Sequence, residues 1–418
     1  MWNLVATALR GWTPRCSLSV GRLSACRCRT RLLARTTCGR PGRSLAAAGC
    51  ASQHTSAASN SKPDSMASEQ RPRLPRVRSA NDLPVREARD DLLKTVLGMD
   101  FGEPALAEAM EALREAVEYN LPGGKRVRLL AVVQTYELLA EEEDAPHLHL
   151  ACLVGWCVEL LQCYFLVLDD IMDGSSMRRG QPCWHTRPDV GLRAINDALF
   201  LDKALGWVLR QRLRSLPCYL PLLELFHEGD LRTVLGQELD MVAAAAGGAG
   251  QSAVDRYWAT VKFKTAFYSF ALPIRAGMLL AGIEDSLLHE QAQEMALTLG
   301  RIFQVRDDYI DCFGTVEDIG KVGTDIVDRK YSWLFVTALQ LASPQQAELI
   351  QAHVGRGAPG GSDEAAVKAV YRELDLPGHY AAYRERAVCE LNAQIDRLPP
   401  KLAEVFRLQR DAFLRLYP

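Results

Sequence analysis

The chain has 418 residues, of which 48% are hydrophobic and 24% are charged. These fractions are typical of a globular protein, and they exclude a fibrous, collagen-like or wholly disordered chain. The formal net charge of −2 hides an uneven distribution, because acidic residues are almost missing from the N-terminus.

The first segment, residues 1–66, carries ten basic residues and one acidic residue, Asp64. Ser, Thr and Ala fill the intervals between its arginines. An arginine-rich and serine-rich N-terminus that is poor in acidic residues is typical of a mitochondrial transit peptide. We therefore expect a disordered targeting segment over 1–66 and one folded domain over 67–418. A plain basic tail is the alternative, and Met66 offers a start for a cytoplasmic form.

Residues 67–418 hold the other 39 of the 49 basic residues and 50 of the 51 acidic ones, a net charge of −11. Nucleic-acid binding needs a basic face, so we expect no nucleic-acid partner. The seven cysteines of this body are scattered and form no CxxC pair. Neither a zinc site nor a disulfide framework is therefore indicated.

A helical pattern runs from about Leu92 to the C-terminus. Segments rich in Leu, Ala, Glu, Arg and Gln alternate with short breaks that contain Pro or Gly. Met110, Leu113 and Val117 recur at three- and four-residue spacing, which is typical of one buried helical face. No run alternates apolar and polar residues for long enough to indicate a sheet. The sequence predicts an all-α fold.

A glycine-rich basic turn follows, in which Gly123 and Gly124 precede Lys125, Arg126 and Arg128. Proteins use Arg and Lys side chains to bind phosphate groups. Alone, such a turn is as often an exposed basic loop as a binding site. Beside the acidic motifs that come next, a diphosphate pocket is the better interpretation.

The longest apolar stretch, from Leu150 to Leu168, is interrupted by Glu159 and Gln162. A membrane span does not tolerate such residues at low cost, so we expect a buried helix and no membrane span.

Two aspartate clusters share the spacing DDxxD and lie 138 residues apart. The first consists of Asp169, Asp170 and Asp173, and the second of Asp307, Asp308 and Asp311. On a helix, residues i and i+4 share a face, so the first and last aspartate of each cluster point the same way. Such carboxylates repel each other without a compensating cation, and their oxygens are ligands that Mg²⁺ prefers. Solvated helix ends are the alternative reading, which two copies make unattractive.

Basic residues follow both clusters. Arg178 and Arg179 come after the first, and Lys321 and Lys330 come after the second. They supply the positive charge that a diphosphate next to the clusters would require.

Together these motifs resemble the short-chain trans-isoprenyl diphosphate synthase family, and within it the eukaryotic farnesyl diphosphate synthases. The resemblance spans about Asp90 to Phe406 and is strongest over Val154–Trp184, Val261–Pro273 and Phe303–Trp333. It implies the isoprenoid synthase fold, a single bundle of long helices around a deep central cavity, usually as a homodimer. The implied reaction condenses isopentenyl diphosphate with dimethylallyl or geranyl diphosphate, to give geranyl and then farnesyl diphosphate.

The resemblance also assigns residues. About three Mg²⁺ ions, with Mn²⁺ as a second metal, would be held by Asp169, Asp173 and Asp307 and supported by Asp170, Asp308 and Asp311. The implied allylic diphosphate ligands are Arg178, Lys264, Thr265, Gln304, Lys321 and Lys330. The implied isopentenyl diphosphate ligands are Lys125, Arg128, Gln162 and Arg179.

Lys264 and Thr265 lie in an otherwise aromatic and apolar helical run, Val261–Tyr268. A lysine there normally snorkels to solvent. The resemblance instead gives Lys264, Thr265 and Gln304 a catalytic role, in which a local break of the helix aims their polar groups at an allylic cation.

Product length is assigned to Tyr164 and Phe165, because aromatic residues at these positions go with a fifteen-carbon product in the family. Leu168 is larger than the family residue and leaves a ten-carbon product, from a geranyl diphosphate synthase, as an alternative. Leu129 stands where the family usually has Gly, and the chain ends at Pro418 without the basic tail of close relatives.

Two other function classes are weighed. A catalytically weak regulatory or heteromeric subunit would need the fold but not the metal clusters, and here every cluster position is filled. A terpene cyclase would need neither the second cluster nor Lys125, Arg128 and Arg179.

Overall fold

The computed structural model describes residues 77, 79–141, 147–246, 251–315 and 323–416. All of them belong to the second of two units into which the chain divides, Gln70–Pro418. The expected targeting segment 1–66, Lys321 and the end of the chain at Pro418 lie outside the described residues.

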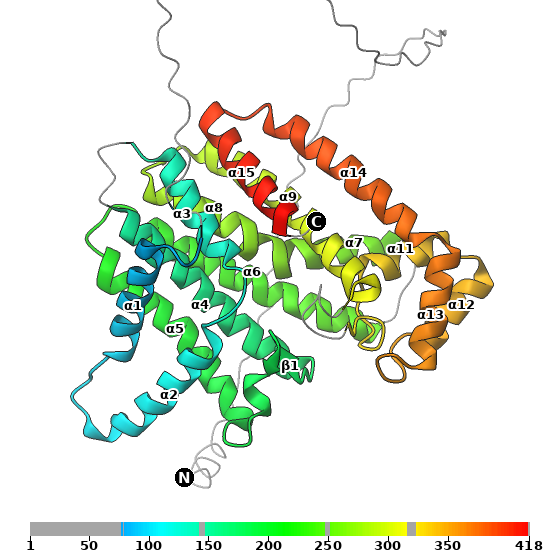
Figure 1. Cartoon of the computed structure of the whole chain (residues 1–418), viewed down its shortest axis with the longest axis horizontal. Helices are drawn as coiled ribbons and strands as arrows, with labels where there is room; N and C mark the ends of the chain where they lie inside the picture. The colour runs from blue at the N-terminus through cyan, green and yellow to red at the C-terminus, as the bar shows by residue number, and fades with distance from the viewer. Residues whose placement is uncertain (1–76, 78, 142–146, 247–250, 316–322, 417–418) are drawn as a thin grey trace, which may run out of the picture. The chain divides into compact units, whose positions relative to one another are not determined.

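The described part of the chain is almost entirely helical, which confirms the all-α prediction (Figure 1). The helices are α1 (Leu83–Leu97), α2 (Ala107–Asn120), α3 (Val127–Leu139), α4 (Leu148–Met172), α5 (Ala194–Leu213), α6 (Tyr219–Ala246), α7 (Gln251–Thr260), α8 (Leu272–Leu280), α9 (Ser286–Phe313), α11 (Trp333–Leu341), α12 (Pro344–His353), α13 (Ser362–Glu373), α14 (Leu376–Ile395) and α15 (Pro400–Leu416). A π-helical segment, η5 (Val261–Ala271), joins α7 to α8. The strands β1 (Met177–Arg178) and β2 (Gln181–Pro182) form a small antiparallel hairpin.

Helix α4 is the centre of the core. It packs against α1, α3 and α5, and most of its side chains are buried because apolar residues surround it on every side. It is also the one described helix long and apolar enough to span a membrane, but 78% of its most apolar window is buried. The burial supports the reading of a core helix.

The C-terminal helices complete the bundle. In Figure 1, α14 and α15, drawn in orange and red, return across the long helix α9, and both contact it. A second apolar cluster, which includes Trp333, Phe335 and Tyr371, connects α11 and α13 to this end of the bundle. Helix α9 is thus contacted by η5, α14 and α15, and residues of its second half line a cavity.

The segment η5 runs between α6 and α9 and packs closely on both. The sequence predicted a local break in the run Val261–Tyr268. The structure instead shows a continuous π-helix over this run, which continues into α8. Widened turns of this kind are frequent at functional sites.

Candidate active site

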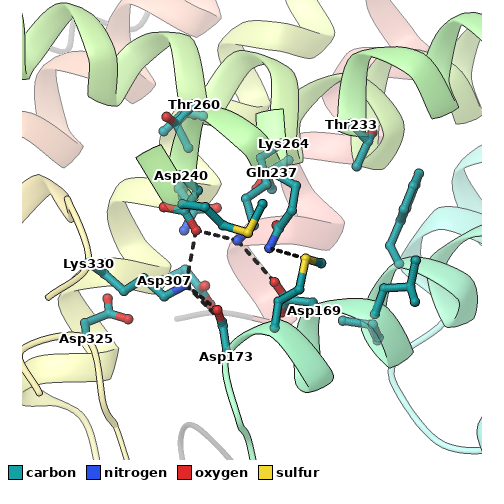
Figure 2. Close-up of a pocket in the computed structure, with 18 of the residues that line it drawn as sticks. Asp169, Asp173, Thr233, Gln237, Asp240, Thr260, Lys264, Asp307, Asp325 and Lys330 are labelled. Carbon is teal, nitrogen blue, oxygen red and sulfur yellow. Dashed lines mark hydrogen bonds and ion pairs between the residues drawn. The ribbon is translucent and has the colours of Figure 1, made fainter. Parts of the chain in front are cut away.

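A cavity of about 510 Å³ lies where α4, α6, η5 and α9 converge (Figure 2). We call it the aspartate cavity, since Asp169, Asp173, Asp307 and Asp311 all line it. The two clusters thus meet across one space, although 138 residues separate them in the sequence. This is the deep cavity that the resemblance implies.

Within the first cluster the three aspartates differ. Asp169 and Asp173 line the aspartate cavity, as their i, i+4 spacing predicts. Asp170 is only 4% exposed and lies outside that lining. Arg178 Nε donates to Asp170 Oδ1 at 3.0 Å. Asp170 therefore does not line the cavity itself but holds Arg178, which does.

The second cluster differs, because Asp307, Asp308 and Asp311 all line the aspartate cavity. Asp308 is 5% exposed and accepts hydrogen bonds from Tyr257 Oη at 2.8 Å, Gln304 Nε2 at 2.8 Å and Trp333 N at 2.7 Å. Burial raises the pKa of Asp308 to about 7, in spite of these donors. Asp311 Oδ1 accepts from Asp325 N at 3.0 Å and so anchors the loop that follows α9.

Two lysines lie between the clusters. Lys264 Nζ is 2.6 Å from Asp240 Oδ2 and 3.2 Å from Asp169 Oδ1. Lys330 Nζ is 2.9 Å from both carboxylate oxygens of Asp173 and 3.1 Å from Asp240 Oδ2. Figure 2 shows how Asp240 is shared by the two ammonium groups. The compensating cations that the aspartates require are therefore lysines in this state.

The pKa values follow from this arrangement. Burial would raise the pKa of Asp169, but Lys264, Lys330 and Arg178 together lower it. The same balance, dominated by Lys264 and Lys330, lowers the pKa of Asp240. For Asp173, burial and the charge of Asp169 outweigh Lys330 and raise the pKa. The lysines stay charged, because their carboxylate partners raise their pKa values against the effect of burial.

The sequence reasoning did not find Asp240. It lies on α6 three residues after Gln237, and both side chains line the aspartate cavity. A signal was present, because Gln237 and Asp240 share one face of a helix that is otherwise rich in Leu, Val and Ala. Tyr257, which bonds to Asp308, was missed for lack of any comparable pattern.

The cavity suits a magnesium ion in the chemistry of its donors. The candidate ligands are carboxylates, and Asp169 Oδ1 is buried without a hydrogen bond although Lys264 is within ion-pair distance. Among the described residues, no three Asp, Glu, His or Cys side chains are grouped so that they could hold a metal ion as they are. In this arrangement Lys264 and Lys330 occupy the carboxylates.

A second cavity of about 610 Å³ adjoins the first and is more apolar. Lys125 lines this second cavity, Gln162 lines the aspartate cavity, and Arg128 lines both. Arg128 Nη2 donates to Ser269 Oγ at 2.6 Å and to Tyr268 Oη at 3.2 Å. The structure thus places three of the predicted isopentenyl diphosphate ligands around the junction of the two cavities.

Arg179 is the exception, since it lines neither of these two cavities. Its Nη1 donates to the carbonyl oxygens of Pro122 at 3.1 Å and Asn120 at 3.4 Å. Gly124 adopts a positive φ of 77°, and an added Cβ there would lie 3.3 Å from the Arg179 guanidinium. The glycine thus lets Arg179 pack against the turn that carries Lys125.

Aromatic rings form part of the lining of the aspartate cavity. The Tyr164 and Phe165 ring centroids are 4.8 Å apart, and Phe165 meets Tyr268 edge-on at 5.2 Å. Leu168 lies in the same lining. Thr265 and Gln304 also line the cavity, and the amide nitrogen of Gln304 donates a hydrogen bond to Asp308.

Leu129, the departure next to Arg128, is fully buried against α4. An added Cβ at Gly155 would lie 3.0 Å from both Leu129 Cγ and the Leu129 carbonyl oxygen. The missing side chain at Gly155 therefore makes room for Leu129, and the close contact of α3 and α4 is preserved.

Comparisons with known proteins agree with this geometry. A sequence model of the family described as polyprenyl synthetase matches residues 110–374. Farnesyl pyrophosphate synthase of Rattus norvegicus is 45% identical over 319 residues, which cover 74% of this chain and 90% of the relative. Farnesyl pyrophosphate synthase 2 of Arabidopsis thaliana is 39% identical over 332 residues, or 76% and 96%. The solved structure of T. brucei farnesyl diphosphate synthase complexed with risedronate aligns with a TM-score of 0.71 and 31% identity, over 80% of this chain and 99% of that one.

Proposed function

The chain belongs to the polyprenyl synthetase family, and from that premise we propose that it is a prenyltransferase that makes farnesyl diphosphate. The observation that carries the proposal is the meeting of both aspartate clusters, Lys264 and Lys330 in one cavity. The substrates are isoprenoid diphosphates. We assign isopentenyl diphosphate as the acceptor, and dimethylallyl and then geranyl diphosphate as the allylic substrates.

The aspartate cavity would bind the allylic diphosphate. Asp169, Asp173 and Asp307 would hold about three Mg²⁺ ions, which when bound neutralise the charge that develops on the departing diphosphate. Lys264 and Lys330 would turn from their carboxylates to the same diphosphate once metal ions neutralise the aspartates, and Arg178 would bind it with charge-assisted hydrogen bonds of the same kind. Asp170 would keep Arg178 aimed at the cavity.

The residues below the clusters would protect the allylic cation that remains. Tyr164, Phe165 and Tyr268 line the cavity and would exclude water and limit its depth. The Thr265 hydroxyl and the Gln304 carbonyl oxygen would face the positive charge. Arg128, at the junction, would hold isopentenyl diphosphate beside it, and the departing diphosphate would take up the proton released after the new bond forms.

A product assay tests this proposal. Residues 67–418 are incubated with isopentenyl and geranyl diphosphate and Mg²⁺, and the products are identified by mass. A fifteen-carbon diphosphate is expected, and Asp169→Ala should reduce kcat by at least about a hundredfold, because the departing charge loses its support. No condensation by a folded wild-type domain would refute the enzyme and favour a regulatory subunit. A ten-carbon final product would indicate a geranyl diphosphate synthase, in which Leu168 limits chain length.

The proposal includes a homodimer. Apolar side chains are exposed along one part of α6, where Leu231, Leu235 and Val242 are 53%, 49% and 50% exposed. On the neighbouring α5, Ile195 and Leu199 are 42% and 46% exposed. Several exposed apolar side chains on two neighbouring helices are typical of a protein interface, and a second copy of the chain would cover them.

We further propose that segment 1–66 directs the protein to mitochondria, on the basis of its ten basic residues and one acidic residue. A fluorescent protein fused to residues 1–66 is expected in mitochondria, while a fusion that begins at Met66 should remain in the cytoplasm. A cytoplasmic signal from the first fusion would contradict the proposal.

A further inference from the structure

Arg126 belongs to the basic turn but turns away from both cavities. Its side chain is 6% exposed, and its Nη1 lies 2.7 Å from Oε2 of Glu159, which is 2% exposed. Arg126 Nη2 donates to the carbonyl oxygen of Leu121, at the start of the turn. The guanidinium carbon also lies over the Trp156 ring, 4.9 Å from its centroid. A residue that the sequence grouped with phosphate ligands is therefore part of a buried ion pair.

Glu159 connects this pair to α3. Its Oε1 accepts from Leu129 N at 3.3 Å, in the first turn of that helix. Arg126 precedes α3 with φ 54° and ψ 29°, a left-handed conformation that residues other than glycine rarely adopt. Leu121, Arg126 and Leu129 are thus tied together by the two side chains of one ion pair. Lys125 and Arg128 lie between these tied points.

The charge distribution supports the same role. Burial lowers the pKa of Arg179, the charges of Arg126 and Arg128 lower it further, and Glu159 opposes this effect. Glu159 therefore offsets the repulsion among three arginines. Glu159 contacts the basic turn through Arg126 and the start of α3 through Leu129. Gln162, three residues further along α4, lines the aspartate cavity, so the ion pair lies close in sequence to a predicted ligand.

We propose that the Arg126–Glu159 ion pair is a positioning device for the isopentenyl diphosphate side of the active site. The pair holds the turn so that Lys125 and Arg128 face the junction of the cavities, and neither member touches substrate. The inference rests on the proposed function. It predicts an effect on one substrate alone, because Lys264 and Lys330 are held by Asp169, Asp173 and Asp240 instead.

The test is Glu159→Gln in the 67–418 protein used for the product assay, with KM measured for each substrate. The KM for isopentenyl diphosphate is expected to rise about tenfold or more, because small displacements of binding groups are costly. The KM for geranyl diphosphate and kcat should stay within about twofold. Glu364→Gln is the matched control, since Glu364 is a buried carboxylate 2.5 Å from Lys368 Nζ and lines neither cavity. It should leave both KM values unchanged.

Arg126→Lys is the second variant, and it decides the question if Glu159→Gln does not fold. Lysine keeps the charge but lacks the fork that reaches Glu159 and the Leu121 carbonyl together, so a smaller rise in the same KM is expected. An unchanged KM for isopentenyl diphosphate in a folded variant, or equal changes for both substrates, would overturn this inference alone. Absence of product from the wild-type protein would overturn the proposed function and this inference with it.

Discussion

The aspartates of the second cluster have different surroundings although they share one motif. All three line the aspartate cavity, but Asp308 is only 5% exposed and accepts three hydrogen bonds from the protein. One of the three donors is Gln304, whose remaining amide oxygen is then fixed in direction. Asp308 is therefore fixed by donors on α7, α9 and α11, which is the arrangement of a residue that supports its neighbours in the cluster.

The first prediction concerns the titration of Asp308. Its pKa is raised from 3.8 to about 7 in the folded protein, so the folded state binds the proton more tightly than the unfolded state. The stability that this group contributes is full below the unfolded pKa and is lost as the pH rises through about 7. The free energy of unfolding, relative to that of Asp308→Asn, should be larger at about pH 5 than at about pH 7.5, by on the order of 2 kcal/mol.

Urea unfolding of both proteins at the two pH values measures this difference. Asp100→Asn serves as a control, because Asp100 lies far from the clusters in sequence and is exposed. Equal pH dependence in the wild type and Asp308→Asn would show that Asp308 is not the group responsible.

The second prediction concerns Phe165. Its ring packs against Tyr164 and Tyr268 in the cavity lining, so Phe165→Ala should remove part of the wall that limits chain growth. We expect products longer than fifteen carbons by mass spectrometry, with the metal dependence retained. Phe263→Ala is a control, as Phe263 is an aromatic residue of the same segment η5 that is not in this lining. An unchanged product length would assign chain-length control to other residues.

At the scale of elements, two glycines determine how closely η5 approaches its neighbours. A Cβ added at Gly236 of α6 would lie 2.1 Å from Lys264 N, and one added at Gly300 of α9 would lie 2.4 Å from Ala266 Cβ. The backbone of η5 thus packs directly on both long helices. This close packing brings Lys264 within reach of Asp240 on α6 and Asp169 on α4.

The third prediction follows from this contact. Gly236→Ala should push η5 away from α6, lower the free energy of unfolding by about 1–3 kcal/mol and raise the KM for geranyl diphosphate. Thermal unfolding and steady-state kinetics measure the two effects. In Gly206→Ala the added methyl group meets nothing within 4 Å, so that variant should be neutral or slightly stabilising. Normal kinetics in Gly236→Ala would show that the placement of Lys264 tolerates a shift of η5.

The assembly of the whole molecule is expected to involve the exposed apolar residues of α5 and α6. Leu231 and Leu235 are about half exposed on the helix whose other face carries Gln237 and Asp240. An interface at this position would therefore stiffen one wall of the cavity. Dimer formation and catalysis are then expected to be coupled through α6.

The fourth prediction tests that coupling. Leu235→Glu should shift the protein from dimer to monomer in sedimentation experiments, because a charge is costly to bury in an apolar interface. Leu287→Glu, at a residue that is 59% exposed on α9, should not change the assembly. A monomeric wild-type protein would contradict the proposed dimer. A dimer that persists in Leu235→Glu would show that the interface lies elsewhere.

The helical class, the two aspartate clusters and the family could all be read from local patterns in the sequence. Helical periodicity places Asp169 near Asp173 and Asp307 near Asp311, whatever the rest of the chain does. Family membership and the prenyltransferase function are confirmed by the relatives. The assigned ligands remain predictions, and the structure brings most of the described ones to the two adjoining cavities.

Local patterns could not predict which side chains meet across the bundle. Lys330, in the loop before α11, contacts Asp173, at the end of α4, over 157 residues of sequence, and Asp240 joins them from α6. Packing also places Asp170 and Arg126 outside both cavities, while neighbours of the same type line one. The physical reason is that local propensity fixes the helices, whereas burial and partners depend on how distant helices pack against one another.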